Sequence, residues 1–284
     1  MQLQTNLKQQ RSIEEEFTSL EVVYEEEHQL AWYRMNAHPR PCFTSRLIKD
    51  IQSNFLATIE NNTNSIKHIV MSSNTKGVFN LGGDLELFKR LILERDRDQL
   101  LEYALKSIEP LYQFHVGLGM EITTISLVQG DALGAGFEAA ISGDLLIAER
   151  SAKMGLPEVL FNMFPGMGAY SFLSRKVNSQ LADKMILEGK LYSAEELYDL
   201  GVVDILVEDG EGEKAVYAYL KKQARSINTY KAVRKAKKCI STVTFEELAE
   251  IASIWVDANM NLGQRDLRMM ERLVKRQTAK YTIV

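Results

Sequence analysis

Several features that mark other protein classes are scarce or missing in these 284 residues. Only two cysteines occur, Cys42 and Cys239, and neither stands in a C-x-x-C pair or a His/Cys cluster, so neither a disulfide framework nor structural zinc is expected. With 5 prolines, 17 glycines, 45% hydrophobic and 25% charged residues, the composition excludes collagen-like and disordered chains. The length alone favours about two domains.

A long apolar run and an excess of basic charge are missing as well. The longest apolar region, Ala132 to Ala148, is interrupted by Glu138 and Asp144, so we expect no transmembrane helix. The polar N-terminus contains no signal-peptide core. A net charge of −4 gives no global attraction for nucleic acid. We therefore expect a soluble, cytoplasmic protein that neither binds nucleic acid nor inserts into a membrane.

Common catalytic and cofactor motifs are also missing. The four histidines show no metal-ligand spacing, and His115 is interpreted as a packed or capped side chain, with a substrate contact as the alternative. There is no G-x-S-x-G elbow and no phosphate-binding P-loop. The segment beginning at Gly134 has the glycines of a dinucleotide loop, but its apolar character and Glu138 argue against a nicotinamide. We expect no metal and no cofactor.

Hydrophobic periodicity predicts a mixed α/β core. A β-hairpin fits Leu20–Tyr24 and Leu30–Met35, and a helix follows from Thr44 to about Glu60. A unit of short strand, glycine-containing turn and helix then recurs. Its strands are expected at Ile66–Ser72, Ile122–Val128, Leu145–Ala148 and Val202–Val207, and its helices at Asp84–Leu93, Ala135–Ser142 and Tyr170–Val177. This alternation argues for parallel strand pairing.

The chain divides into three regions. Residues 1–20 form a polar N-terminal segment, residues 21–211 the α/β core, and residues 212–284 a helical C-terminal subdomain, because strand signals cease after about residue 212. Thr244 and Glu247 have the spacing of a capping box at the start of a helix that carries Trp255. We expect this subdomain to pack on the core or on a neighbouring subunit and to close the active site.

Two glutamates stand in unusually apolar surroundings. Glu138 lies one turn after the start of a predicted Gly/Ala-rich helix, and Glu158 is flanked by Pro157 and Val159. A buried carboxylate without partners responds with a raised pKa, which suits general acid–base catalysis near neutral pH. The alternative is that both are satisfied structurally, by a helix N-terminus or a buried arginine.

Two glycine-rich segments accompany the glutamates. Phe79–Asp84 and Ala132–Gly136 each follow a predicted strand and open a predicted helix. Backbone N–H groups at a helix start are unpaired, and glycine allows a ligand oxygen to approach them. Two such segments facing one carbonyl would form an oxyanion hole. Tight packing turns look the same, so each segment alone is a weak signal.

Taken together, these motifs are specific enough to indicate a protein family. The order F-x-x-G-x-D, G-x-A-x-G-x-G-x-E, G-x-P-E and P-G resembles the enoyl-CoA hydratase/isomerase (crotonase) superfamily, from about residue 20 to the end. The resemblance implies a spiral of β-β-α units with a helical C-terminal trimerisation region. It implies that Glu138 and Glu158 are the catalytic pair. It also implies oxyanion donors at Leu81, just before Gly82, and at Ala135.

Within this superfamily the chain departs from ordinary hydratases. Where those continue P-G-x-G-G-T-Q-R-L, this sequence has PGMGAYSFL from Pro165, and VFNLGGDLELF, FHVGLG and IWVDANMNLGQ closely resemble the bacterial synthases of diffusible signal factor (DSF). The similarity implies a quorum-sensing enzyme that dehydrates a 3-hydroxyacyl-carrier-protein thioester to a cis-2-enoyl thioester and then hydrolyses it. By analogy, Glu158 would remove the C2 proton and Glu138 would protonate the departing hydroxyl, with the reverse order also open.

A medium-length acyl chain requires an apolar tunnel. Leu133, Leu156 and Met167 flank the matched motifs, and Trp255 lies on the helix expected to close over them, so these four are candidate lining residues. Ordinary core packing is the alternative for each.

Eight basic residues without an acidic one lie between residues 221 and 238: Lys221, Lys222, Arg225, Lys231, Arg234, Lys235, Lys237 and Lys238. Acyl carrier protein is acidic and coenzyme A (CoA) carries phosphates, so either could dock here; a solvated helix face is the other interpretation.

Two rival functions remain: an ordinary hydratase or isomerase of CoA thioesters, and a crotonase-like docking partner of a signalling sensor. The resemblance also implies that the enzyme could bind the sensor of its own circuit.

Overall fold

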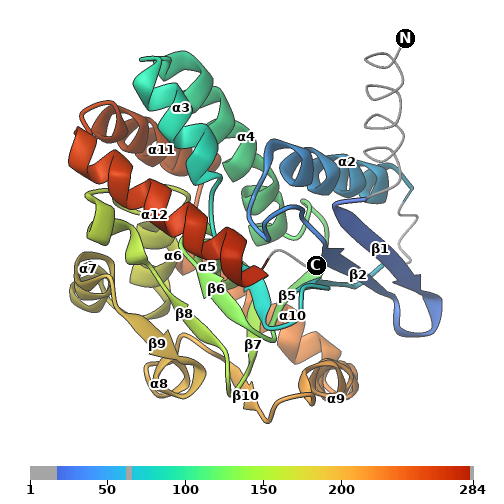
Figure 1. Ribbon diagram of the computed structural model, residues 1–284. Coiled ribbons are helices and arrows are strands. Elements are labelled where there is room, and N and C mark those ends of the chain that lie inside the picture. Colours follow the sequence, from blue (N-terminus) through green and yellow to red (C-terminus); the bar gives the residue numbers. More distant parts are fainter. Residues whose placement is uncertain (1–17, 62–65, 282–284) are drawn as a thin grey trace.

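The computed structural model describes residues 18–61 and 66–281 (Figure 1). Of the predicted N-terminal segment, residues 1–17 therefore lie outside the described part of the chain. Two sheets form the centre of the molecule, and helices surround them.

The larger sheet has six strands in the order β1-β2-β3-β5-β7-β10, and the smaller has four in the order β4-β6-β8-β9. Pairing is parallel except between β1 and β2 and between β8 and β9. The strands are β1 (Leu20–Glu25), β2 (Leu30–Met35), β3 (His68–Ser73), β4 (Val78–Asn80), β5 (Thr123–Val128), β6 (Asp131–Leu133), β7 (Leu145–Glu149), β8 (Lys153–Gly155), β9 (Leu191–Ser193) and β10 (Ile205–Val207). The predicted hairpin and the parallel α/β core are confirmed.

Eleven α-helices and two short 3-10 helices occur in the described residues. The α-helices are α2 (Ser45–Asn61), α3 (Leu85–Leu93), α4 (Arg97–His115), α5 (Ala135–Ser142), α6 (Ala169–Lys176), α7 (Ser179–Glu188), α8 (Ala194–Asp199), α9 (Gly212–Ala224), α10 (Ile227–Ile240), α11 (Phe245–Asn259) and α12 (Gln264–Tyr281). The 3-10 helices are η1 (Glu26–His28) and η2 (Pro157–Phe161).

Three successive β-β-α units organise the core. In each unit the first strand joins the large sheet (β3, β5, β7) and the second joins the small sheet (β4, β6, β8). Because β4, β6 and β8 pair in parallel, their carboxyl ends lie at one edge of the small sheet. The loops that leave this edge are the glycine-rich segments and the G-x-P-E segment singled out in the sequence.

The large sheet is buried on both faces. One face belongs to the main core, in which α2, α4 and α5 contribute Phe55, Leu100 and Phe137. The other face packs against α9 through Val216 and Leu220. Because both faces are covered, every residue of β5 and β7 is buried, instead of every second one.

The C-terminal helices complete the same core. Helix α11 packs on α4, and α12 packs on α3 and η2 (Figure 1). Their buried residues Trp255, Val256 and Met270 belong to the main cluster. Thr244 caps α11 by accepting from the Glu247 N–H at 3.1 Å. The Glu247 carboxylate, expected to reach back to the cap, instead accepts two hydrogen bonds from Arg175, at 2.8 and 2.9 Å, because this cation lies beside it.

Candidate active site

The edge of the small sheet brings three loops together. Loop 81–84 follows β4, loop 134–136 follows β6, and the loop to η2 follows β8. Gly82 has a positive φ of 101°, and an ideal Cβ on it would lie 2.9 Å from Leu133 O and 3.4 Å from Ala135 N. The two glycine-rich loops therefore contact each other through backbone atoms, and only glycine fits at Gly82.

Glu138 lies in the first turn of α5 and is 1% exposed. Its Oε1 accepts hydrogen bonds from the backbone N–H groups of Met167 and Ala169, both at 2.8 Å. Burial raises the pKa of Glu138 to about 7, although the two N–H bonds act in the opposite direction. Its carboxylate is therefore oriented by backbone and titrates near neutral pH.

Glu158 lies in η2 and is 8% exposed. Its Oε2 is buried and has no hydrogen-bond partner among the described residues. Burial, and then the negative charge of Glu138, raise the pKa of Glu158 well above its usual range. The motifs thus do place the two glutamates in one electrostatically coupled site, in which only Glu138 accepts hydrogen bonds from the N–H groups of Met167 and Ala169.

Gly134 contacts both glutamates, Glu138 through its backbone N–H and Glu158 through its carboxyl group. Its carbonyl accepts from the Glu138 N–H at 3.0 Å, and an ideal Cβ on it would lie 2.3 Å from Glu158 Oε1. Its φ of 54° lies in the left-handed region. Gly134 thus opens α5 and leaves the space that the Glu158 carboxyl group occupies.

The backbone donors differ from the expectation at one position. The Leu81 N–H donates to Pro41 O at 2.8 Å, and the Gly82 N–H donates to Asn80 Oδ1 at 2.8 Å, so both are already used. The cause is the segment before α2, which lies alongside the loop and forms a parallel bridge between Phe43 and Gly83.

Among the N–H groups at this edge that have no acceptor within the described part of the chain are those of Gly83, which sequence reasoning missed, and of Ala135, the first residue of α5. No feature of the sequence distinguishes Gly83 from Leu81 as a donor, because the distinction depends on Pro41, which is far away in the chain.

A buried cation supports loop 81–84. Arg40 is 5% exposed, and its Nη2 donates to Asp84 Oδ1 at 3.0 Å and to Glu86 Oε2 at 2.8 Å. Asp84 is the N-cap of α3 and accepts from the N–H groups of Glu86 and Leu87. Arg40 therefore fixes the residue that ends the loop, a role that its place in the HPRPCF segment did not indicate.

The four candidate lining residues surround the glutamates at different places. Leu156 is the N-cap of η2, and Leu133 ends β6. Met167 donates its N–H to Glu138 and also lines an apolar cavity. Trp255 packs edge-on against Phe88, with ring centroids 5.0 Å apart, and its ring fills the space beside Gly166.

The remaining predicted residues, His115 and the basic segment 221–238, are not part of the loops at this edge of the small sheet. The His115 Nδ1 lies 2.8 Å from Ser142 O and its ring packs on Phe172, and burial lowers its pKa, as for a packed histidine. Of the basic segment, Lys231 and Lys235 both pair with Glu121. Arg234 pairs with Asp144 at 3.5 Å and Lys238 donates to Val116 O at 3.3 Å. Half of its charges are thus engaged within the chain.

Among the described residues no group of three or more His, Cys, Asp or Glu could hold a metal ion. None of the helices within residues 18–61 and 66–281 has the length and apolar character needed to cross a bilayer.

Comparison with known proteins is consistent with this site. Residues 26–266 match the family model described as enoyl-CoA hydratase/isomerase. A probable mitochondrial enoyl-CoA hydratase 2 from Arabidopsis thaliana is 32% identical over 197 residues, which cover 68% of this chain and 61% of that protein. The alpha subunit of a fatty acid oxidation complex from Pseudomonas putida is 32% identical over 143 residues, 50% of this chain and 19% of that subunit. The chain thus spans less than two thirds of the length of these two relatives.

Solved structures share the fold. Enoyl-CoA hydratase from Bacillus halodurans superposes with a TM-score of 0.74 at 22% identity, covering 89% of this chain and 99% of that one. DspI from Pseudomonas aeruginosa gives a TM-score of 0.65 at 22% identity, covering 93% and 97%. The chain belongs to the enoyl-CoA hydratase/isomerase family, and the predicted crotonase-like α/β fold with a helical C-terminal region is confirmed.

Proposed function

We propose that the chain interconverts 3-hydroxyacyl and 2-enoyl thioesters, and that its specific role is DSF synthesis. In that role it dehydrates a 3-hydroxyacyl thioester of acyl carrier protein and hydrolyses the cis-2-enoyl product to the free acid. The observation that carries the proposal is the pair of buried glutamates, both with a raised pKa, beside two unused N–H groups. The segments similar to DSF synthases support the finer assignment.

The unused donors provide the site for the thioester carbonyl. We assign the N–H groups of Gly83 and Ala135 to its oxygen, in place of the Leu81 N–H, which Pro41 already engages. Negative charge that develops on this oxygen is stabilised by about 3 kcal/mol per well-placed donor. The carbonyl thereby makes the C2 proton acidic enough for a carboxylate to remove.

The hydrogen bonds of the two carboxyl groups favour one position for the starting proton. Burial and the charge of Glu138 favour the protonated form of Glu158, whereas Glu138 ionises near pH 7 with its carboxylate held by two N–H groups. We therefore assign Glu138 as the base and Glu158 as the acid for dehydration. This is the reverse of the order first expected by analogy, and the alternative that the sequence had left open.

In the proposed dehydration, one proton moves to Glu138 and one leaves Glu158. The Glu138 carboxylate takes the C2 proton, and the C–H electron pair forms the enolate, whose oxygen faces Gly83 and Ala135. As the enolate collapses, the C2–C3 double bond forms and the C3–O bond breaks. The departing hydroxyl takes the proton of Glu158 and leaves as water.

Hydrolysis uses the same carbonyl position. The glutamate left ionised by dehydration removes a proton from a water molecule, which attacks the thioester carbonyl carbon. The C–S bond breaks, and the departing thiolate is protonated, which releases the carrier thiol and the free enoic acid. The side chains of Glu138 and Glu158 are thus the proposed acid and base of both steps, and the backbone N–H groups of Gly83 and Ala135 are the proposed oxyanion donors.

The thioester carrier and the assembly belong to the same proposal. We propose acyl carrier protein as the carrier, with CoA as the alternative that the relatedness to enoyl-CoA hydratases favours. We also propose a homotrimer, because Leu160, Leu187 and Leu191 are 60%, 68% and 42% exposed around Gly189. Light scattering that gives the mass of one chain would rule out the trimer. Binding to the sensor protein of the same circuit is a second proposed role, and a pull-down with that sensor tests it.

One assay tests the proposed activity. Purified protein is incubated with 3-hydroxydodecanoyl-carrier protein and, separately, with the CoA thioester, and the products are identified by mass spectrometry. Free cis-2-enoic acid from the carrier-protein thioester is the expected result. Enoyl-CoA without hydrolysis would reduce the function to an ordinary hydratase, and no turnover of either would favour a docking protein.

Three variants connect the assay to the site. Glu138→Gln and Glu158→Gln are each expected to abolish product formation while the protein stays folded. Glu149→Gln is the matched control, because Glu149 is also buried but accepts from Gln129 and Gly212 in the large sheet. Full activity in either of the first two variants would remove that residue from the mechanism.

A further inference from the structure

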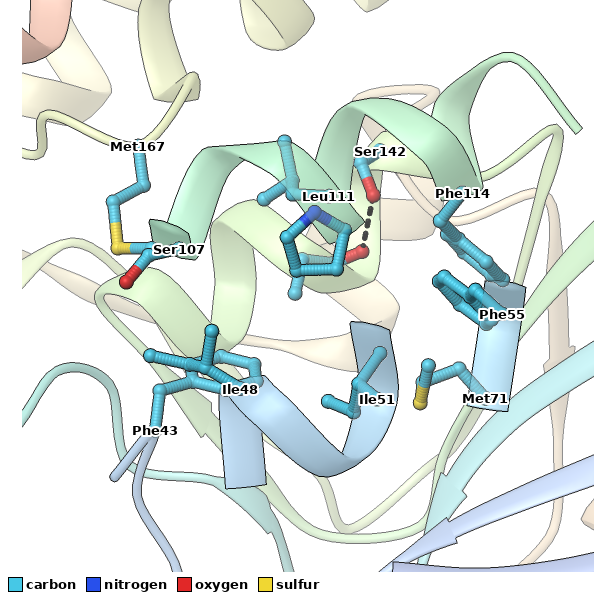
Figure 2. A pocket seen from close by; sticks show the side chains of 12 residues that line it. Phe43, Ile48, Ile51, Phe55, Met71, Ser107, Leu111, Phe114, Ser142 and Met167 are labelled. Atoms are coloured by element: carbon cyan, nitrogen blue, oxygen red, sulfur yellow. Dashed lines mark hydrogen bonds between the residues drawn. The ribbon is translucent and has the colours of Figure 1, made fainter. Parts of the chain in front are cut away.

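An apolar cavity of about 40 Å³ lies between α2, α4 and α5 (Figure 2). Its polar lining atoms are turned away from any ligand. The Ser107 hydroxyl donates to Tyr103 O, and the Ser142 hydroxyl donates to Ala139 O, each at 2.8 Å. The cavity therefore offers no hydrogen bond to a guest, and its chemistry suits a hydrocarbon.

One end of this cavity begins at the catalytic loops. Met167 lines it and donates its backbone N–H to Glu138, and Ala139 lines it from the next position of α5. Phe43 lines the same end and donates its N–H to Gly82 O at 2.8 Å. Figure 2 shows Met167 and Phe43 together on one side of the cavity.

The opposite end is closed by aromatic rings. Phe55 of α2 and Phe114 of α4 stack with ring centroids 6.3 Å apart and an interplanar angle of 4°, and Phe55 also contacts Tyr33. Met71 of β3 lies beside them (Figure 2). The cavity is thus bounded by flexible methionines at its sides and by a fixed pair of rings at its end.

We propose that this cavity receives the distal end of a linear acyl chain, and that Phe55 and Phe114 set the chain length. The inference rests on the proposed acyl-thioester function. The cavity is little larger than the volume of one water molecule, about 30 Å³. A chain therefore enters as the Met167 side chain turns aside. Leu133, Leu156 and Trp255 do not line this cavity.

A chain-length series tests the proposal. The measured quantity is kcat/KM for 3-hydroxyacyl thioesters from 6 to 16 carbons, where each buried methylene contributes about fourfold. Ser107→Leu and Ser142→Val fill the cavity and are expected to shift the optimum to shorter chains by two carbons or more, with the shortest substrate changed less than twofold. Phe55→Leu shortens the end wall and is expected to shift the optimum to longer chains.

The matched control is Leu56→Ala, because Leu56 neighbours Phe55 on α2 but is 45% exposed. Circular dichroism and thermal unfolding identify which variants fold. An unchanged length profile in the folded cavity variants would overturn the inference while the proposed function stands. Altered profiles in the Leu56→Ala control would overturn it as well.

A second measurement needs no catalysis. Dodecanoic acid with a terminal diazirine is bound to the wild-type protein and photolysed, and the labelled peptides are identified. Labels on α2 or α4 are expected, and labels confined to the Trp255 region would overturn the inference. If no thioester is turned over but α2 and α4 are labelled, the proposed function fails and the acyl-binding cavity remains.

Discussion

The carboxyl group of Glu158 lies directly against Gly134, so that a methyl group on Gly134 would stand 2.3 Å from Glu158 Oε1. Gly134 also accepts the Glu138 N–H. One glycine at the start of α5 thus limits the position of the Glu158 carboxyl group, the proposed acid, and supports the helix that carries Glu138, the proposed base.

Replacing this glycine tests that relationship. Gly134→Ala is expected to lower kcat/KM at least 100-fold, because the new methyl group displaces the Glu158 carboxyl group. The control is Gly201→Ala: Gly201 also has a positive φ, 76°, but nothing lies within 4 Å of its ideal Cβ. Both variants place an alanine at a positive φ, which strains the backbone, but only the first should lose activity. Equal kinetics of the two folded variants would contradict the geometry.

Burial of the glutamates also predicts how stability depends on pH. A folded-state pKa above the unfolded value means that the native state keeps a proton that the unfolded state releases. The free energy of unfolding therefore falls as pH rises from about 4.5, the usual value, toward the folded pKa, which is about 7 for Glu138 and well above the usual range for Glu158. Each pH unit of separation costs about 1.4 kcal/mol.

Glu158→Gln removes one of these two penalties. Its melting temperature is expected to match that of the wild type near pH 4.5 and to exceed it by a margin that grows up to pH 8. Thermal unfolding across this range measures the difference. Glu60→Gln, at an exposed position of α2, should give parallel curves. A variant that is less stable than the wild type at pH 8 would mean that the ionised carboxylate is stabilised in the fold.

The sequence predicted the large sheet and the helices better than the small sheet. The six-residue strand β5 and the amphipathic helix α2 are long enough for their hydrophobic pattern to be recognised. Strands β4, β6 and β8 have three residues each, too few for any period to be detected. These strands align the loops of the proposed site. The residues of the site could therefore be predicted from the sequence, but the strands that bring them together could not.

The same limit applies within the site. Glu138 and Glu158 were recognisable because charged residues in apolar surroundings are unusual. The free donor at Gly83 was not, because it depends on a hydrogen bond from Leu81 to Pro41, 40 positions away in the chain. The cavity between α2 and α4 depends likewise on how side chains from separate elements pack, which no local pattern encodes.

Arg40 gives the last prediction, because it acts on the oxyanion loop without lying in it. Its Nη2 holds both Asp84 and Glu86, and Asp84 ends loop 81–84 as the cap of α3. Arg40→Gln leaves Asp84 without its cation, so the loop shifts and the Gly83 N–H no longer meets the carbonyl oxygen. We expect kcat to fall at least tenfold, a loss of about 1.4 kcal/mol in barrier stabilisation, while KM changes little.

The conservative variant distinguishes positioning from simple destabilisation. A single nitrogen contacts both carboxylates, so the ammonium group of Arg40→Lys can replace it, and this variant is expected to recover most of the lost kcat. Arg90→Gln is the matched control, because Arg90 lies on α3 in an exposed pair with Glu94. If the rate of Arg40→Gln falls only in proportion to its unfolded fraction, or if Arg40→Lys is equally slow, then Arg40 does not position the donor, and the contacts of loop 81–84 with Pro41, Asn80 and Phe43 hold it instead.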